Sequence, residues 1–264
     1  MIITFHLLAL GCYGVATACA LVPFVFGRPV PRFLSLGAPL AGAALHVVGV
    51  TQLTLVGLAP TLSVLALCLV ALQVLSERVL RTAAVSLFTA PLAAGLVGLA
   101  LLLGFGAGAE PSGGRNAWFI LHVTLSVLGV ALLALAFISA ALYLLQFREL
   151  KTKRFGHVFR FFPPLERLDQ LNRAALVAGF PILTLGVLLA LGYAQRFASG
   201  MHLPPAQLVW GVFTWVVLGW AVWVRTLRGW SGRRGAFASI AGFAAVVLVY
   251  VALKLAAPGA ERFL

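Results

Sequence analysis

Histidine is the residue type best placed to do chemistry in this chain. The 264 residues include five histidines, and three of them, His6, His46 and His122, lie in long apolar stretches. His157 falls in a basic segment and His202 in a short polar one. A neutral imidazole is a good ligand for iron, and ionisable residues inside membrane spans commonly serve function. The three histidines in apolar stretches are therefore the candidates for a cofactor site.

The surroundings of these histidines favour the pair His46 and His122. From the expected span ends, a rise of 1.5 Å per residue places His122 about 9 Å deep, His46 about 18 Å deep and His6 about 6 Å deep. Small residues flank His46, and Ser126 and Gly129 share the helical stripe of His122, which leaves room for a flat cofactor or a close helix. Larger side chains surround His6. The pattern predicts two imidazoles on facing helices with a haem between them, and a structural hydrogen bond from each histidine is the alternative.

Other kinds of chemistry are poorly supported. All six acids are expected in loops or at span ends, which disfavours an ion-coupled transporter and removes the carboxylates of glycosidases and of Ser-His-Asp triads. The three cysteines form no CxxC pair, and no HExxH or phosphate-binding loop is present. We therefore expect a protein that is not an enzyme. The acids are Glu77, Glu110, Glu149, Glu166, Asp169 and Glu261.

Tryptophans form a second group of candidate residues. Trp118 is expected at a membrane interface near His122, and Trp215 belongs to a span with four tryptophans between residues 210 and 223. Packing and an interfacial aromatic belt explain most of this enrichment. A wall for an aromatic ligand is the sharper alternative, so both residues join the candidate cofactor site.

The elements that must position these residues are membrane helices. Apolar residues make up 62% of the chain and charged residues 9%, whereas soluble domains have roughly 45–50% and about 25%. Stretches of about 20 apolar residues predict an all-α, polytopic membrane protein with eight transmembrane helices in a single domain, residues 1–264. The expected spans are Ile2–Phe26, Phe33–Leu58, Pro60–Leu75, Thr82–Leu103, Asn116–Phe147, Arg173–Tyr193, Ala206–Val224 and Ala236–Leu255.

The charge distribution predicts the orientation. Fifteen of the 19 Lys and Arg residues fall in alternate connecting segments, which places those segments in the cytoplasm and both termini outside. We expect a multi-pass protein of a bacterial-type inner (cytoplasmic) membrane, with the lipid bilayer as its partner. The net charge of +13 does not indicate nucleic acid, because no soluble segment is long enough for a binding domain. The basic segment 147–171 is expected to lie partly as an interfacial helix on anionic lipid, with docking of a protein partner as the alternative.

Several stretches together resemble the cytochrome c assembly protein family, the CcsA/CcmC group of haem-handling membrane proteins. They occur in the family's order and cover about residues 116–250. The stretches are Leu121–Thr124 with Ala141–Gln146, Pro164–Asp169 with Gly179–Gly186, Trp210 and Trp215 with Gly229–Arg234, and Gly242–Phe243.

This resemblance implies about eight helices that hold haem, with His122 as an axial ligand on the outer side. The chain departs from the cytochrome synthases: their Trp-Asp-Pro loop is replaced by Met201–Gln207, and two of their histidines fall at Trp223 and near Glu261. The pattern is closer to the HemX/YpjD-like branch, which has a histidine in span two like His46. The implied function is haem handling in cytochrome c assembly or in regulation of haem synthesis, with a haem b on His46 and His122.

Two alternatives stay open. The protein could be a transporter or exporter of a small molecule or metal ion, because eight spans permit it. It could also be a non-catalytic assembly scaffold that recruits cytochrome assembly or haem synthesis proteins through segment 147–171.

Overall fold

The computed structural model describes residues 1–80, 84–106, 117–153, 161–197 and 205–256. In these residues it contains eight long helices and no strand, which confirms the all-α prediction. The helices are α1 (Ile2–Phe26), α2 (Arg32–Val50), α3 (Leu58–Leu80), α4 (Ser86–Leu103), α5 (Ala117–Thr152), α7 (Leu165–Phe197), α8 (Pro205–Thr226) and α9 (Gly232–Ala256). Over the residues that the structure describes, seven of them are long and apolar enough to cross a membrane. The eighth span and the outer position of both termini stay predictions.

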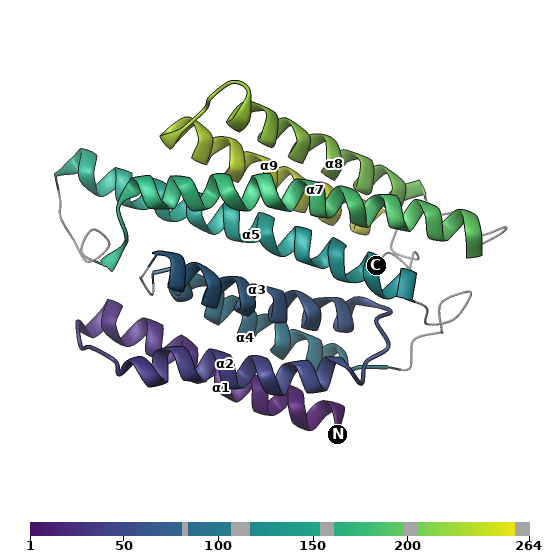
Figure 1. Ribbon diagram of the computed structural model, residues 1–264, viewed down its shortest axis with the longest axis horizontal. Coiled ribbons are helices and arrows are strands. Elements are labelled where there is room, and N and C mark those ends of the chain that lie inside the picture. The colour runs from purple at the N-terminus through teal and green to yellow at the C-terminus, as the bar shows by residue number, and fades with distance from the viewer. Residues whose placement is uncertain (81–83, 107–116, 154–160, 198–204, 257–264) are drawn as a thin grey trace.

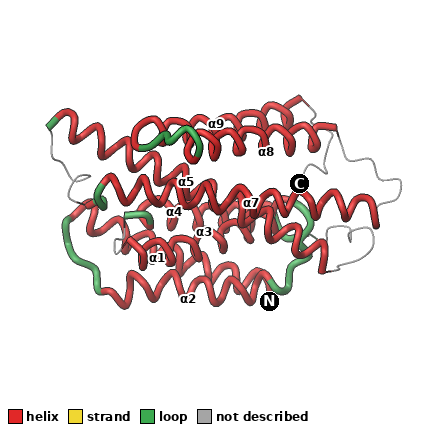
Figure 2. Tube along the Cα trace, turned by 45° about the horizontal axis from the view of Figure 1, so that its top comes forward, coloured by secondary structure: helices red, strands yellow, loops and turns green. Residues whose placement is uncertain are grey.

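The helices form two groups that lie side by side with their axes nearly aligned. Helices α1 to α4 make one group, and α5, α7, α8 and α9 make the other (Figure 1). The tube view shows the same division from a second direction (Figure 2). The groups meet mainly where α3 packs on α5. Any site in one group is therefore separate from a site in the other, unless it lies at this junction.

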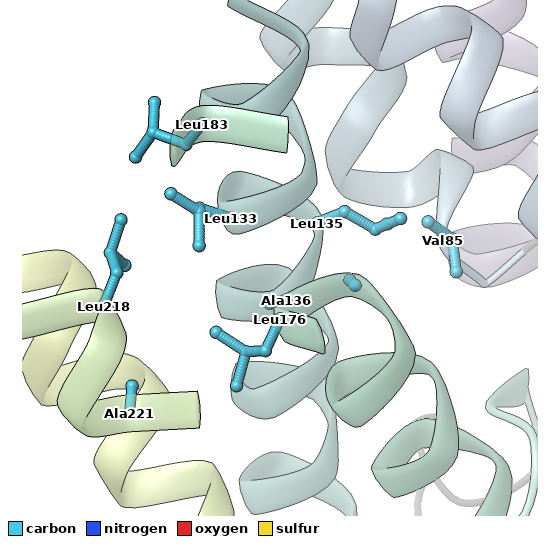
Figure 3. Packing of buried hydrophobic residues seen from close by; sticks show 9 residues of the cluster. Val85, Leu133, Leu135, Ala136, Leu176, Leu183, Leu218 and Ala221 are labelled. Atoms are coloured by element: carbon cyan, nitrogen blue, oxygen red, sulfur yellow. The ribbon is translucent and has the colours of Figure 1, made fainter. Parts of the chain in front are cut away.

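Helix α5 is the buried centre of the second group. Its residues Leu133, Leu135 and Ala136 join a cluster with Leu176 of α7 and Leu218 of α8 (Figure 3). Helix α5 differs from its neighbours in the extent of its burial. In an apolar 18-residue stretch of α5, 67% of the residues are buried inside the protein, against 28% for α1 and for α7. Helix α5 thus provides the rigid support for side chains at its ends.

The expected end of the second span is wrong. Helix α2 ends at Val50 and not near Leu58, although residues 47–58 are mostly apolar. Thr51 Oγ1 and Gln52 Nε2 both donate to the carbonyl of Val48, at 2.9 and 3.1 Å, and so satisfy a carbonyl that the ended helix leaves free. Gly57, with a φ of 99°, then turns the chain into α3. Hydropathy alone does not detect these two signals.

The basic segment 147–171 is partly absorbed into the long helices. Helix α5 continues to Thr152, and α7 begins at Leu165, eight residues before the expected start at Arg173. Residues 154–160, in the middle of the segment in which an interfacial helix was expected, lie outside the described residues. Phe162 of the same segment is buried and stacks on Phe24 of α1, with ring centroids 6.2 Å apart. The Phe162 ring thus packs the start of α7 against α1 of the first helix group.

Glycines let α5 and α7 approach closely. A Cβ on Gly129 would lie 2.9 Å from the Cβ of Leu183, and a Cβ on Gly186 would lie 3.0 Å from the backbone nitrogen of Ser126. Small residues that bring helix backbones together are typical of membrane helix pairs. The space beside Ser126 and Gly129 is therefore filled by a helix.

An ion pair joins the ends of α7, α8 and α9. Arg225 is 2% exposed, and its Nη1 donates to Asp169 Oδ1 at 2.9 Å and to the carbonyl of Trp230 at 2.9 Å. The backbone N–H of Gly232 donates to the same carboxylate oxygen at 3.0 Å. A buried guanidinium is costly unless a carboxylate and carbonyls satisfy it, so this corner depends on Asp169.

We predict that Gly129→Ala destabilises the protein by about 1–3 kcal/mol, because the added methyl group meets the Cβ of Leu183 and α7 must move. The measurement is the thermal unfolding midpoint in detergent. Gly95→Ala is the matched control, since nothing lies within 4 Å of a Cβ there. Equal midpoints for the two variants would contradict the close α5–α7 contact.

We also predict that Asp169→Asn lowers the stability by about 1–3 kcal/mol, because it leaves the buried Arg225 without a counter-charge. Glu166→Gln, on the exposed side of the same helix turn, removes an equal charge and should leave the unfolding midpoint unchanged. A midpoint for Asp169→Asn that matches Glu166→Gln would show that the ion pair does not hold this corner.

Candidate functional site

His6 and His46 lie together in the α1–α4 group and share one hydroxyl. His6 Nε2 is 2.9 Å from Ser63 Oγ, and His46 Nε2 is 2.8 Å from the same oxygen. His6 Nδ1 bonds to the carbonyl of Ile2 at 2.8 Å, and His46 Nδ1 bonds to the hydroxyl of Tyr13 at 3.1 Å. We call these linked groups, from Ile2 through His6, Ser63 and His46 to Tyr13, the histidine chain. The side chains of all four linked residues are at most 1% exposed.

Two glycines of α2 place the rings of α1. Gly42 and Gly49 lie one turn before and one turn after His46, on the same face of the helix. A Cβ on Gly42 would lie 2.6 Å from the ring of Tyr13, and a Cβ on Gly49 would lie 2.8 Å from the ring of His6. The small residues beside His46 therefore accommodate the aromatic side chains of α1, and the room expected for a flat cofactor is occupied.

His122 lies at the start of α5 against α7. Its Nδ1 donates to the carbonyl of Gly186 at 2.7 Å, with Ser126 Oγ 3.4 Å away. The described part of the chain offers its Nε2 no hydrogen-bond partner. Metal-binding histidines commonly donate one ring N–H to a carbonyl, which fixes the lone pair on the other nitrogen. The geometry of His122 thus fits an axial ligand, whereas both nitrogens of His46 are already engaged.

The two candidate tryptophans lie on different sides of α7. Trp118 Nε1 donates to the carbonyl of Leu189 at 2.8 Å, three residues from Gly186 and on the same face of α7 as His122. Trp215 Nε1 donates to Thr184 Oγ1 at 3.0 Å. Thr184 and Gly186 are two residues apart, so they lie about 160° apart around the helix. Trp118 therefore belongs with His122, and Trp215 does not.

The structure does not bring His46 and His122 together, which corrects the expected pairing. His46 bonds to α1 and α3, and His122 bonds to α7 in the other helix group. The reason is that α2 packs on α1 and α3, whereas the start of α5 packs on α7. The early end of α2 instead decides the height of His46. Because α2 ends at Val50, His46 is four residues from that end, about 6 Å deep and level with His6. A span that continued to Leu58 would have placed it about 18 Å deep.

Glu77 also differs from expectation. It lies within α3 in the segment Leu58–Val79, which meets the criteria for a membrane span, and it is 8% exposed. Its carboxylate takes part in side-chain hydrogen bonds with Ser86 and Gln73, and Thr89 Oγ1 donates to Gln73 Oε1 at 2.8 Å. Glu77 is three residues from the end of α3, so it lies at a span end as expected, but its burial was not expected.

Sequence reasoning also missed Ser63 as a member of the site, and it treated Tyr13 only as bulk beside His6. A single serine in an apolar span is not a distinctive signal, since such residues often bond to their own helix. Its role follows only from the packing of α3 against α1 and α2. His157 and His202 lie outside the described residues.

Comparisons with known proteins place the chain in a family. The model of the family described as "Cytochrome C assembly protein" matches residues 55–260. The cytochrome c biogenesis protein CcsA of Chlamydomonas reinhardtii is 26% identical over 150 residues, which cover 56% of this chain and 41% of that protein. CcsA of Guillardia theta is 24% identical over 164 residues, covering 56% and 54%. CcsA of Prochlorococcus marinus is 31% identical over 99 residues, covering 37% and 31%.

The chain spans about half or less of the length of these curated relatives. Helices α1 and α2, with His6 and His46, precede the matched residues, whereas Ser63 and His122 lie inside them. Because the match covers most of the chain, this protein belongs to the cytochrome c assembly protein family.

Proposed function

We propose that this protein is a haem-binding membrane protein that acts in cytochrome c assembly or in regulation of haem synthesis, with His122 as an axial ligand of a haem b. The observation that carries the proposal is the hydrogen bond between His122 Nδ1 and the carbonyl of Gly186, with no partner for Nε2 among the described residues. The names of the CcsA relatives, which are cytochrome c biogenesis proteins, support the same role.

The residues around His122 are suited to orient an imidazole at the end of a helix pair. The carbonyl of Gly186 holds the N–H tautomer, since a carbonyl can only accept. Trp118 lies one turn before His122 and is anchored on Leu189, so both rings are held against α7. When bound, haem would supply an iron centre for electron transfer or for delivery to another protein.

No second axial ligand is part of this proposal. His46 would have to give up its bonds to Tyr13 and Ser63 to bind a metal, and a buried polar group that loses its partner costs about 1–3 kcal/mol. A haem held by His122 alone would exchange more readily than one held by two residues, which would suit a protein that passes haem on. Membership of the HemX/YpjD-like branch and the bacterial-type cytoplasmic membrane remain predictions.

Transport of a small molecule or metal ion is the second candidate, and the buried Glu77 favours it, since intramembrane acids often mark ion pathways. The described residues contain no group of three or more His, Cys, Asp and Glu able to hold a metal ion. Glu77→Gln should abolish uptake into vesicles if transport is the function. A scaffold that binds assembly proteins through segment 147–171 would instead tolerate changes at both Glu77 and His122.

The haem proposal predicts that His122→Gly lowers the haem content of the purified protein at least about 10-fold. The reason is that loss of a haem ligand weakens haem binding more than loss of a group that only orients the ligand. The measurement is the Soret absorbance per protein after expression with added haem. Imidazole in the buffer should restore the band, since it can occupy the vacated ligand position.

Trp215→Phe is the matched control, because Trp215 lies on the opposite side of α7 and its loss should leave the Soret band unchanged. A wild-type protein without a Soret band, or a band that His122→Gly leaves intact, would refute the assignment. Loss of the band in Trp215→Phe alone would move the haem to the α7–α8 face.

A further inference from the structure

Arg233, in the first turn of α9, is held against two aromatic rings. Its guanidinium carbon lies 5.9 Å from the centre of the Phe147 ring on α5 and 5.4 Å from the centre of the Phe237 ring, one turn further along α9. The Phe147 ring is itself fixed, because it stacks on the buried Tyr143 with ring centroids 6.2 Å apart. Attraction to two aromatic rings thus gives this arginine a defined position at the protein surface.

The N–H donors of Arg233 have no oxygen partner among the described residues. The side chain is exposed, and in this part of the chain its guanidinium makes neither a hydrogen bond nor an ion pair. Glu149, two residues after Phe147, lies about 160° around α5 from that ring. A guanidinium presents five N–H groups in one plane, a geometry that matches two oxygens of a phosphate group. Arg233 is therefore suited to bind a phosphate from outside the protein.

The charges next to Arg233 favour an anion. Arg234 follows it, and the first turn of α9 contains no acid. Asp169 accepts the backbone N–H of Gly232, but this carboxylate is already paired with the buried Arg225. Two adjacent arginines thus share this turn of the helix without an acid of their own.

The apolar surface that continues from Arg233 fits an acyl chain. The span of α9 begins at Gly232, so Arg233 lies at the level where the hydrocarbon region of a bilayer would end. Phe237, Ala241 and Leu248 follow Arg233 on the same face of α9, and all three are exposed. A phosphate at Arg233 would therefore lie at the head of an apolar stripe, which matches a phospholipid better than a soluble anion.

We infer that the Arg233 site, formed by Arg233 with the rings of Phe147 and Phe237, binds the phosphate of one anionic phospholipid whose acyl chain lies along α9. Arg233 supplies paired N–H donors, and the two rings hold its guanidinium in place. Arg234 adds a charge that favours an anionic headgroup over a zwitterionic one. The charge distribution of the sequence predicts the cytoplasmic leaflet for this end of α9.

This inference does not depend on haem binding at His122. His122 lies near the other end of α5, about 38 Å from Phe147 along the helix. The site also differs from the basic segment 147–171, because Arg233 and Phe237 belong to α9.

The test counts lipids on the full-length protein by native mass spectrometry, after purification from nanodiscs with equal amounts of phosphatidylglycerol and phosphatidylcholine. The wild type should retain one phosphatidylglycerol in preference to phosphatidylcholine. Arg233→Ala should weaken phosphatidylglycerol binding at least about tenfold, because charge-assisted hydrogen bonds to the phosphate are lost. Arg233→Lys keeps the charge but not the planar fork, so its affinity should lie between those of the wild type and Arg233→Ala.

Arg234→Ala is the matched control. It removes the same charge from the same turn, about 100° around α9 from Arg233, and should weaken binding less than about twofold. Phe147→Leu removes a ring but no charge, and should weaken binding about two- to fivefold, because the guanidinium loses one of the two rings that position it. Unfolding midpoints of the variants in detergent report whether each one is folded.

Three results would overturn the inference. The first is equal retention of the two lipids by the wild type, a comparison that needs no variant. The second is phosphatidylglycerol binding that Arg233→Ala leaves intact or lowers no more than Arg234→Ala does, which would indicate a general attraction of lipid to a basic surface. The third is displacement of phosphatidylglycerol by added inorganic phosphate, which would show that the site takes a soluble anion.

Discussion

A polar group inside an apolar medium must find its hydrogen-bond partner within the protein, because no water is present to replace it. This constraint explains the most informative contacts between helices. Ser63 joins His6 to His46, Asp169 joins α7 to Arg225, and Asn172 Nδ2 donates to the carbonyl of Ala136 at 2.7 Å. Each contact fixes the rotation of one helix relative to another, which apolar packing alone would leave less defined.

The same constraint gives the histidines different surroundings. His6 and His46 use all four of their ring nitrogens within the α1–α4 group, so they hold no free lone pair for a metal. His122 uses one nitrogen to bind α7, and the other has no partner among the described residues. Chemically identical side chains at similar depth thus join helices in one group, and in the other provide the proposed haem ligand.

The small residues beside His46 and His122 leave space at the helix surface, which a flat cofactor or a close helix could fill. The structure fills it with helices. Gly42 and Gly49 accommodate the rings of Tyr13 and His6, and Gly129 accommodates Leu183. A stripe of small residues specifies a close approach, but the approaching group lies elsewhere in the chain and cannot be read from the stripe itself.

The sequence by itself determined the all-α membrane architecture and the limits of α1, because hydropathy and helical periodicity act over neighbouring residues. It also made His122 a candidate ligand. It did not determine the end of α2, the burial of Glu77 or the partner of His46. The side chains of Thr51 and Gln52 end α2 early, and this raises His46 to the level of His6. Which residues meet depends on the relative height and rotation of separate helices, and only tertiary packing decides those.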